Sequence, residues 1–218
     1  SSKRINLIIL KDITKAFGSQ KILQNVNLSI EKGQKTVVLG QNGAGKSSLM
    51  RTILGEYIPT SGSVAIDGFD SFKQRSRALR GISFVPQTPP PLKLSLNELI
   101  YFAERTADAS RADIVKFCDE MELDLSSNLN KPFHKLSGGM KQKFLIALAF
   151  GRASKVMIFD EPTANLDPSA RERFKTLLHN YAKDKSLIFI SHRLEEVGGL
   201  VKRMISMDLG RIVDDKNV

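Results

Sequence analysis

A glycine-rich loop at residues 40–48 is the part of the sequence that most directly indicates chemistry. It reads Gly-Gln-Asn-Gly-Ala-Gly-Lys-Ser-Ser and follows the apolar run 36–39. Glycines let a loop turn tightly and aim its N–H groups at an anion, and a helix that begins there adds its positive dipole end. In this pattern Lys46 reaches the β- and γ-phosphates of a nucleotide, and Ser47 binds Mg²⁺. The loop therefore predicts a nucleoside triphosphate site rather than a turn that only saves space.

Two adjacent carboxylates, Asp160 and Glu161, come directly after the apolar run 156–159. Acidic side chains at the carboxyl end of a buried strand can serve a metal-bound phosphate. We expect Asp160 to hold Mg²⁺ through water and Glu161 to polarise the attacking water. The alternative, a pair of surface charges, is disfavoured because the same chain carries the phosphate loop.

Further polar residues follow other apolar runs. His192 comes just after residues 187–190, and Gln87 follows residues 82–85. In open α/β sheets ligands bind at the carboxyl ends of strands, which favours functional roles over those of a surface histidine and a loop amide. Ser137-Gly138-Gly139 opens a predicted helix and forms a second anion site, although alone it also reads as an ordinary N-cap.

The elements that must position these residues alternate between strands and helices. Apolar and polar residues alternate around 5–9 and 26–30, which predicts β-hairpins leading into a strand at 36–39, with a turn at Gly33. A helix should follow the phosphate loop and end at Gly55. Further short strands are expected at 64–66, 82–85, 156–159 and 187–190, and a buried helix at 144–149. The order favours an α/β fold with a mostly parallel sheet.

Residues 88–135 differ in character from the rest. Prolines at 89–91 break regular structure, and the run Ser-Leu-Asn-Glu at 95–98 is a capping-box pattern. Leu99, Phe102 and Ala103 then recur at helical spacing. We expect a helical insertion here. Asp167-Pro168 likewise fits an N-cap followed by proline at the first helical position.

Composition bounds the class of protein. The chain has 218 residues, of which 41% are hydrophobic, enough for a full core. We expect no bilayer-spanning stretch and no signal peptide. The single cysteine, Cys118, agrees with a reducing cytoplasm and lies in a helical apolar pattern typical of the core.

A net charge of +10 favours an anionic partner: a nucleotide, a nucleic acid or an acidic membrane surface. The densest basic cluster lacks interleaved aromatic residues, so we interpret it as a solvated face. It comprises Lys73, Arg75, Arg77 and Arg80.

Together these motifs resemble those of the ATP-binding cassette (ABC) ATPases. The run Leu-Ser-Gly-Gly-Met at 136–140 resembles the signature motif, Gln87 the Q-loop glutamine, residues 164–167 the D-loop and His192 the switch histidine. The resemblance covers essentially the whole chain. It implies one ABC ATPase domain over 1–218, with a P-loop NTPase (RecA-like) core and an N-terminal antiparallel β subdomain at 1–87 and 136–218, and the helical subdomain at 88–135.

The resemblance also implies the residues of the site. Glu161, His192 and Lys46 would be catalytic, and Ser47, Gln87 and Asp160 would hold Mg²⁺. Phe17 stands where the family has an aromatic side chain that stacks on adenine, although an aromatic there can also be a core residue. The implied ATP-binding set is Phe17, Ile22, Asn42, Gly43, Ala44, Gly45, Lys46, Ser47, Ser48, Gln87, Ser137, Gly138, Gly139 and Asp167.

The resemblance further implies the partners. Two copies would pack head to tail, so that residues 137–139 of one close on the γ-phosphate held by Lys46 of the other, with Asp167 at the seam. Such a dimer would be the ATPase subunit of an ABC membrane transporter, peripheral at the cytoplasmic face and bound to transmembrane permease subunits. Met140 departs from the usual glutamine, which predicts weaker closure or altered nucleotide preference. With the compact insertion and no C-terminal regulatory domain, it favours an exporter.

Two other classes of protein are alternatives. The positive charge suits a soluble ABC-type ATPase that acts on nucleic acid or ribosomes, but residues 88–135 hold no sustained heptads for a long coiled coil, and only one cassette is present. We therefore do not expect a nucleic-acid partner. A small-molecule kinase on the same scaffold is disfavoured by the signature cluster and the D-loop.

Overall fold

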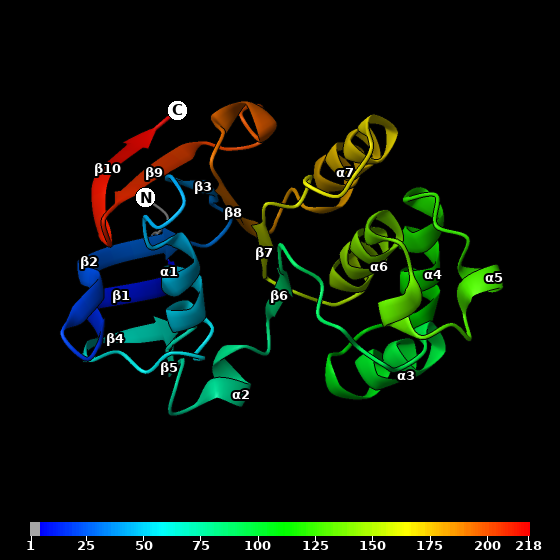
Figure 1. Ribbon diagram of the computed structural model, residues 1–218, viewed down its shortest axis with the longest axis horizontal. Helices are drawn as coiled ribbons and strands as arrows, with labels where there is room; N and C mark the ends of the chain where they lie inside the picture. The colour runs from blue at the N-terminus through cyan, green and yellow to red at the C-terminus, as the bar shows by residue number, and fades with distance from the viewer. Residues whose placement is uncertain (1–4) are drawn as a thin grey trace. The chain divides into compact units, whose positions relative to one another are not determined.

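The computed structural model describes residues 5–218, and the chain forms two compact units (Figure 1). The first unit combines Ser1–Gly81 with Lys185–Val218, and the second is Ile82–Asp184. Residues 1–4 of the predicted domain lie outside the described residues. The predicted division into a core and an insertion at 88–135 stays a prediction.

An antiparallel sheet occupies the N-terminal part of the first unit. Its strands are β1 (Asn6–Phe17), β2 (Gln20–Glu31), β4 (Ser61–Ile66) and β5 (Phe69–Asp70), in the order β2-β1-β4-β5. Apolar residues of β1 and β2 fill its buried face, among them Ile8, Ile13, Leu23 and Val26. The predicted antiparallel β subdomain is confirmed, with a first hairpin that is longer than the sequence pattern indicated.

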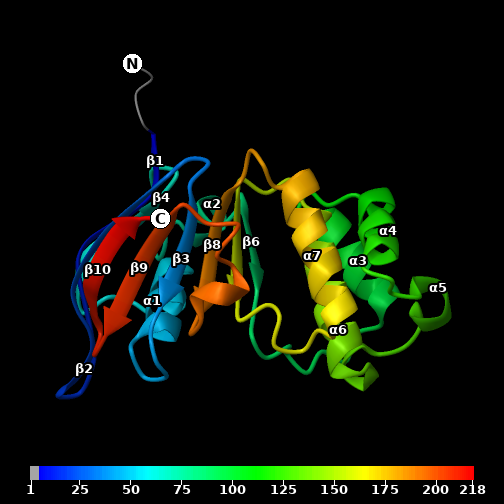
Figure 2. The same cartoon turned by 90° about the horizontal axis from the view of Figure 1, so that it is seen from above.

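The other described strands of the first unit are three parallel strands and one antiparallel strand at their edge. The parallel strands are β3 (Lys35–Leu39), β8 (Ser186–Ser191) and β9 (Arg203–Asp208); β3 pairs in parallel with both neighbours, and β10 (Arg211–Asn217) pairs antiparallel with β9. The apolar runs of β3 and β8 are buried on both faces, as is typical of parallel strands, whereas burial alternates along β9. Helix α1 (Lys46–Ile53) follows β3 and packs against β2 (Figure 2). Short helices α2 (Arg75–Ala78) and η2 (Leu194–Glu196) complete this unit.

The second unit contains one parallel strand pair and most of the helices. β6 (Ile82–Val85) pairs in parallel with β7 (Val156–Asp160), and α6 (Gly138–Phe150) packs on β6 and on α4 (Arg111–Glu120). The other helices are α3 (Leu96–Thr106), α5 (Leu125–Asn128), η1 (Phe133–Lys135) and α7 (Pro168–Tyr181). Figure 1 shows α3, α4 and α6 gathered together. Outside the N-terminal antiparallel sheet the strands pair mostly in parallel, which confirms the predicted α/β class.

Local sequence signals account for several helix boundaries in this unit. The Ser95 hydroxyl accepts the Glu98 N–H at 3.1 Å and contacts the Glu98 carboxylate at 3.0 Å, which confirms the capping box at the start of α3. Phe102 lies in α3, as its helical spacing predicted, but on the exposed side of the helix. Its residue surface is 61% exposed, because the buried face of α3 is formed by Leu96, Leu99 and Ile100 and position 102 falls beyond it.

The single cysteine is part of the core, as predicted. Cys118 on α4 is buried, and its thiol is removed from water while Asp119 lies beside it. Burial, and to a smaller degree the Asp119 charge, raises the pKa of the Cys118 thiol to about 12. Among residues 5–218 no helix combines the length and apolar character that a membrane span needs.

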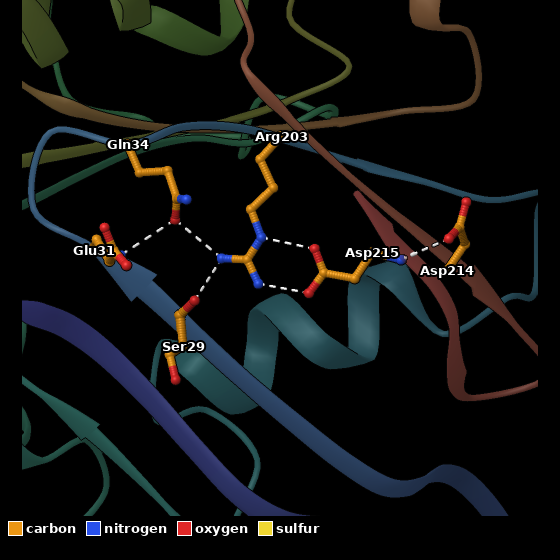
Figure 3. Close-up of polar contacts among 6 residues, drawn as sticks. All are labelled: Ser29, Glu31, Gln34, Arg203, Asp214 and Asp215. Atoms are coloured by element: carbon orange, nitrogen blue, oxygen red, sulfur yellow. Dashed lines mark hydrogen bonds and ion pairs between the residues drawn. The ribbon is translucent and has the colours of Figure 1, made fainter. Parts of the chain in front are cut away.

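One arginine joins the two sheet layers of the first unit (Figure 3). Arg203 on β9 pairs with Asp215 on β10 through two hydrogen bonds, Nε to Oδ1 at 2.8 Å and Nη2 to Oδ2 at 2.6 Å. Its Nη1 donates to the carbonyl of Ser29 on β2 and to Oε1 of Gln34 at 3.0 Å. The Arg203 side chain is only 13% exposed, whereas that of Asp215 is 38% exposed, so water reaches the carboxylate side of this contact.

The basic cluster around α2 is exposed, as expected for a solvated face. Two of its members nevertheless have fixed contacts. Arg75 donates from Nε to the carbonyl of Leu54 at 3.0 Å, and the Arg77 guanidinium lies 5.9 Å from the ring centroid of Phe69. The aromatic contact was missed because Phe69 lies outside the cluster in sequence.

Candidate functional site

The phosphate loop lies between β3 and α1, as predicted. Gly43 and Gly45 have φ angles of +85° and +104°, in the left-handed region that side chains disfavour. At Gly40 a Cβ atom would lie 2.8 Å from both the Ala44 Cβ and the Met207 carbonyl oxygen. Gly43 and Gly45 are therefore required because of their backbone conformation. Gly40 is required because a side chain has no space there, and the same holds to a smaller degree for Gly45.

The start of α1 suits an anion. Gly45 is its N-cap residue and, as a glycine, makes no side-chain cap hydrogen bond to the first turn. The first-turn N–H groups of a helix lack intrahelical partners, and the dipole adds positive potential there. Asn42, Gly43 and Ser47 are exposed beside this end, while Ala44 is buried. The loop thus fits a nucleotide phosphate chain.

Lys46 is held close to the loop by backbone carbonyls. Its Nζ donates to the carbonyl of Gly40 and, at 3.2 Å, to that of Ser191 at the end of β8. Lys46 is only 8% exposed. Carbonyls that solvate the Lys46 amino group in this way hold it near the loop until a stronger anionic ligand replaces them.

The strand end that contacts Lys46 also carries His192. Ser191 is buried; its hydroxyl lies 2.9 Å from Glu196 Oε2 and accepts the Arg193 N–H at 3.1 Å, so the chain on both sides of His192 is tied down. His192 itself is exposed. The structure confirms its place directly after β8, and its catalytic role stays a prediction.

Phe17, at the end of β1, is 51% exposed, which rules out the core alternative. Its ring packs edge-on against Tyr57 with 5.3 Å between centroids, and Lys15 Nζ lies 4.8 Å from its centroid. Tyr57 and Lys15 were missed, because a contact between β1 and the segment after α1 leaves no periodic signal. Ile22 on β2 is partly buried.

The carboxylate pair lies in the second unit. Asp160 is the last residue of β7, and Glu161 follows with a φ of +46°. A non-glycine residue in this region is strained, and such residues cluster at functional sites. The next residue, Pro162, accepts a hydrogen bond through its carbonyl from Nε2 of the fully buried Gln142, at 3.0 Å. Gln142 on α6 therefore fixes the segment after Glu161. The sequence analysis did not predict this role for Gln142.

The signature and D-loop residues also lie in the second unit. Ser137 is the N-cap of α6 and accepts the Met140 N–H at 3.2 Å. A Cβ at Gly139 would lie 3.4 Å from the Asn165 carbonyl, so the two motifs are neighbours. Asp167 caps α7 by accepting the Ala170 N–H at 2.8 Å, with proline at the first helical position, as predicted.

The predicted site residues therefore fall into two groups. The phosphate loop, Phe17, Ile22 and His192 belong to the first unit, whereas the carboxylate pair, the signature motif and the D-loop belong to the second. Gln87, exposed after β6, belongs to the second group as well. Roles that require groups from both units stay predictions.

A phosphate loop between a parallel strand and a helix defines the class of nucleotide-binding α/β proteins. Within that class, residues 23–164 match the family described as ABC transporter. The bacitracin transport ATP-binding protein BcrA of Bacillus licheniformis is 32% identical over 96% of this chain and 69% of its own length. The glutamine transport ATP-binding protein GlnQ of Escherichia coli K12 is 30% identical over 97% and 91%. The chain belongs to the ABC transporter ATP-binding family.

Solved structures agree with this assignment. An ATP-binding subunit of an ABC transporter superposes with a TM-score of 0.87 at 26% identity, covering 97% of this chain and 90% of the other. An ATP-binding cassette in its ADP conformation superposes with a TM-score of 0.78 at 26% identity, covering 98% and 92%. The chain is therefore an ABC nucleotide-binding protein. It spans only 9% of ATP-binding cassette sub-family A member 2 of Rattus norvegicus and 30% of the lactococcin-A transport/processing protein LcnC of Lactococcus lactis.

Proposed function

We propose that this chain is the ATP-hydrolysing subunit of an ABC membrane transporter and that two copies close around two ATP molecules. The observation that carries the proposal is the phosphate loop. Its glycines adopt left-handed angles, its helix begins without a side-chain cap, and Lys46 is solvated by backbone carbonyls beside it. Membership of the ABC family makes ATP the ligand of choice.

On this proposal the residues of the first unit bind the nucleotide. The N–H groups of 42–48 and the Lys46 ammonium bind the phosphates, and Phe17 and Ile22 contact the base end. The ring of Phe17 is exposed enough to stack on adenine. Ser47, Gln87 and Asp160 would hold Mg²⁺, whose charge offsets that of the phosphates. A hydroxyl, an amide and a carboxylate are oxygen ligands of the kind that Mg²⁺ prefers.

Glu161 is proposed to accept a proton from the attacking water, and His192 to orient that water by hydrogen bonding. Both residues follow the carboxyl ends of parallel strands. The tied-down chain around each of them supports the proposal, since a catalytic group must be held in place.

The second copy is proposed to complete the site through its signature motif. The Ser137 side chain accepts the Met140 N–H, and the N–H groups of Gly138 and Gly139 precede that position at the start of α6. A Cβ at Gly138 would have nothing within 4 Å, so this end of the helix is open. These amides would bind the γ-phosphate held by the other copy, with Asp167 at the seam.

The membrane partner is proposed to be a pair of permease subunits, with this chain peripheral at the cytoplasmic face. Export is the favoured direction. The names of similar proteins support it in part, because one is a Nod factor export ATP-binding protein of Rhizobium etli, although GlnQ is a glutamine transport protein. Met140 and the compact segment 88–135 agree with this direction.

The hydrolytic role is tested by exchanging Glu161 for glutamine. We expect ATP turnover to fall by about 100-fold or more, because the proton acceptor is lost, while the affinity for ATP is retained. In Glu161→Gln the backbone at residue 161 keeps the same strained conformation, so the free energy of unfolding should not change. Glu172→Gln, on the exposed face of α7, is the matched control. Turnover of Glu161→Gln at the wild-type rate would refute the proposal, and salt-sensitive stimulation by RNA or DNA would favour a nucleic-acid partner.

A further inference from the structure

The turn between β9 and β10 contacts the phosphate loop. The turn consists of Leu209 and Gly210, far along the chain from the loop. The N–H of Gly210 donates to the carbonyl of Ala44 at 2.9 Å, and the carbonyl of Gly210 accepts the N–H of Gln24 at 2.8 Å. The turn therefore bridges strand β2 and the phosphate loop.

At Gly210 the approach is too close for a side chain. A Cβ at Gly210 would lie 2.4 Å from the Ile22 carbonyl oxygen, and a Cβ at Gly45 would lie 3.1 Å from the Gly210 Cα. Both glycines also have positive φ angles, +77° and +104°. Backbone thus packs directly on backbone between the turn, β2 and the loop, which leaves the loop little freedom on this side.

Because the peptide bond is planar, this contact also fixes the direction in which a neighbouring N–H of the loop points. A trans peptide is planar, so the carbonyl of Ala44 and the N–H of Gly45 point in opposite directions. The described residues contain no cis peptide bonds. Because the Ala44 carbonyl is bonded to the turn, the Gly45 N–H must point away from the turn. That N–H is one of the loop donors expected to bind phosphate.

Side chains add to the same bridge. Gln24 Nε2 donates to the Leu209 carbonyl at 3.3 Å, and Arg211 Nη2 donates to Gln24 Oε1 at 2.8 Å. Gln24 therefore holds the turn against β2 through its side chain as well as its backbone.

We propose that the Leu209–Gly210 turn is a positioning element of the nucleotide site: it fixes the Ala44–Gly45 peptide so that its N–H faces the phosphates. The inference rests on the proposed function, because it assumes that the loop binds ATP. It adds a residue, Gly210, that acts through the loop and does not touch the ligand.

A matched pair of substitutions separates positioning from backbone strain. Gly68 occupies the equivalent place in the Asp67–Gly68 turn, with a φ of +83°, but a Cβ there would meet nothing within 4 Å. Gly210→Ala and Gly68→Ala therefore carry similar strain, and only the first displaces the loop. ATP dissociation constants are measured by calorimetry at a temperature where circular dichroism shows both variants folded. We expect an increase of about tenfold for Gly210→Ala and less than about twofold for Gly68→Ala.

A purely structural role would lower the stability of Gly210→Ala without changing the ATP affinity of the folded protein. Equal ATP affinity in the two variants would therefore overturn the inference. Failure of the wild-type protein to bind ATP would overturn the proposed function and the inference with it.

If Gly210→Ala does not fold, Gln24→Ala replaces it, because at a partly exposed position it removes the side-chain bond to Leu209 of the turn and the bond from Arg211 on β10. We expect its ATP affinity to fall about fivefold, which is the size of effect that the loss of one hydrogen bond produces. Asn27 lies on the same strand as Gln24, and its exposed amide bonds Asp12 on β1, so Asn27→Ala should bind ATP like the wild type. Unchanged affinity in Gln24→Ala would contradict the inference.

Discussion

At the scale of single residues, two of the seven described non-glycine residues with positive φ bear on the proposals. Glu161, the proposed water-activating residue, has a φ of +46°, and Leu209 in the β9–β10 turn has a φ of +47°. Left-handed angles bring a Cβ close to its own backbone and cost about 1 kcal/mol. Neither position could be predicted from sequence, because Leu-Gly is not a typical turn pair and Asp-Glu after a strand gives no signal of a positive φ.

Leu209 offers a direct test of this strain. Its residue surface is 73% exposed, so no core packing is lost on substitution. Leu209→Asn should raise the free energy of unfolding by about 1 kcal/mol, because asparagine tolerates the left-handed region. Leu209→Ala keeps a Cβ without the tolerant side chain, so it should gain nothing. Urea unfolding measures both; equal stability of the two variants would show that the turn is not strained.

At the scale of elements, much of the fold was predictable because its signals are local. The phosphate loop, the capping box at Ser95 and the Asp167-Pro168 cap depend on neighbours in sequence, and each lies where it was expected. What was missed depends on distant pairs. Gln142 reaches Pro162, Tyr57 packs on Phe17, and Gly210 reaches Ala44, and no spacing rule connects these partners.

The contacts of Arg203 can be tested directly, because this one side chain bonds several strands. It joins β9, β10 and β2 through a planar group that bonds two carboxylate oxygens at once (Figure 3). Arg203→Lys keeps the charge but loses the fork, and we expect the free energy of unfolding to fall by about 2 kcal/mol. Arg211 donates from Nη2 to the neutral amide oxygen of Gln24 and not to a carboxylate, so Arg211→Lys should cost clearly less. Comparable losses in calorimetric unfolding would argue against the bidentate contact.

At the scale of the whole molecule, the proposed chemistry needs more than either unit holds. The phosphate loop and His192 lie in one unit, and Glu161 and the signature motif lie in the other. On the proposal, the signature motif of each copy binds the nucleotide held by the other copy. Sequence order identified these motifs, and their meeting around a nucleotide stays a prediction.

The most direct measurement is the mass of Glu161→Gln in solution, determined by sedimentation with saturating ATP and Mg²⁺. Slow turnover should let ATP accumulate between two copies, so we predict a dimer with ATP and a monomer without it. Adding Ser137→Arg should abolish the dimer while ATP still binds, since a long side chain would block the signature end of α6. A monomer of Glu161→Gln in saturating ATP and Mg²⁺, with ATP bound, would contradict the proposed function.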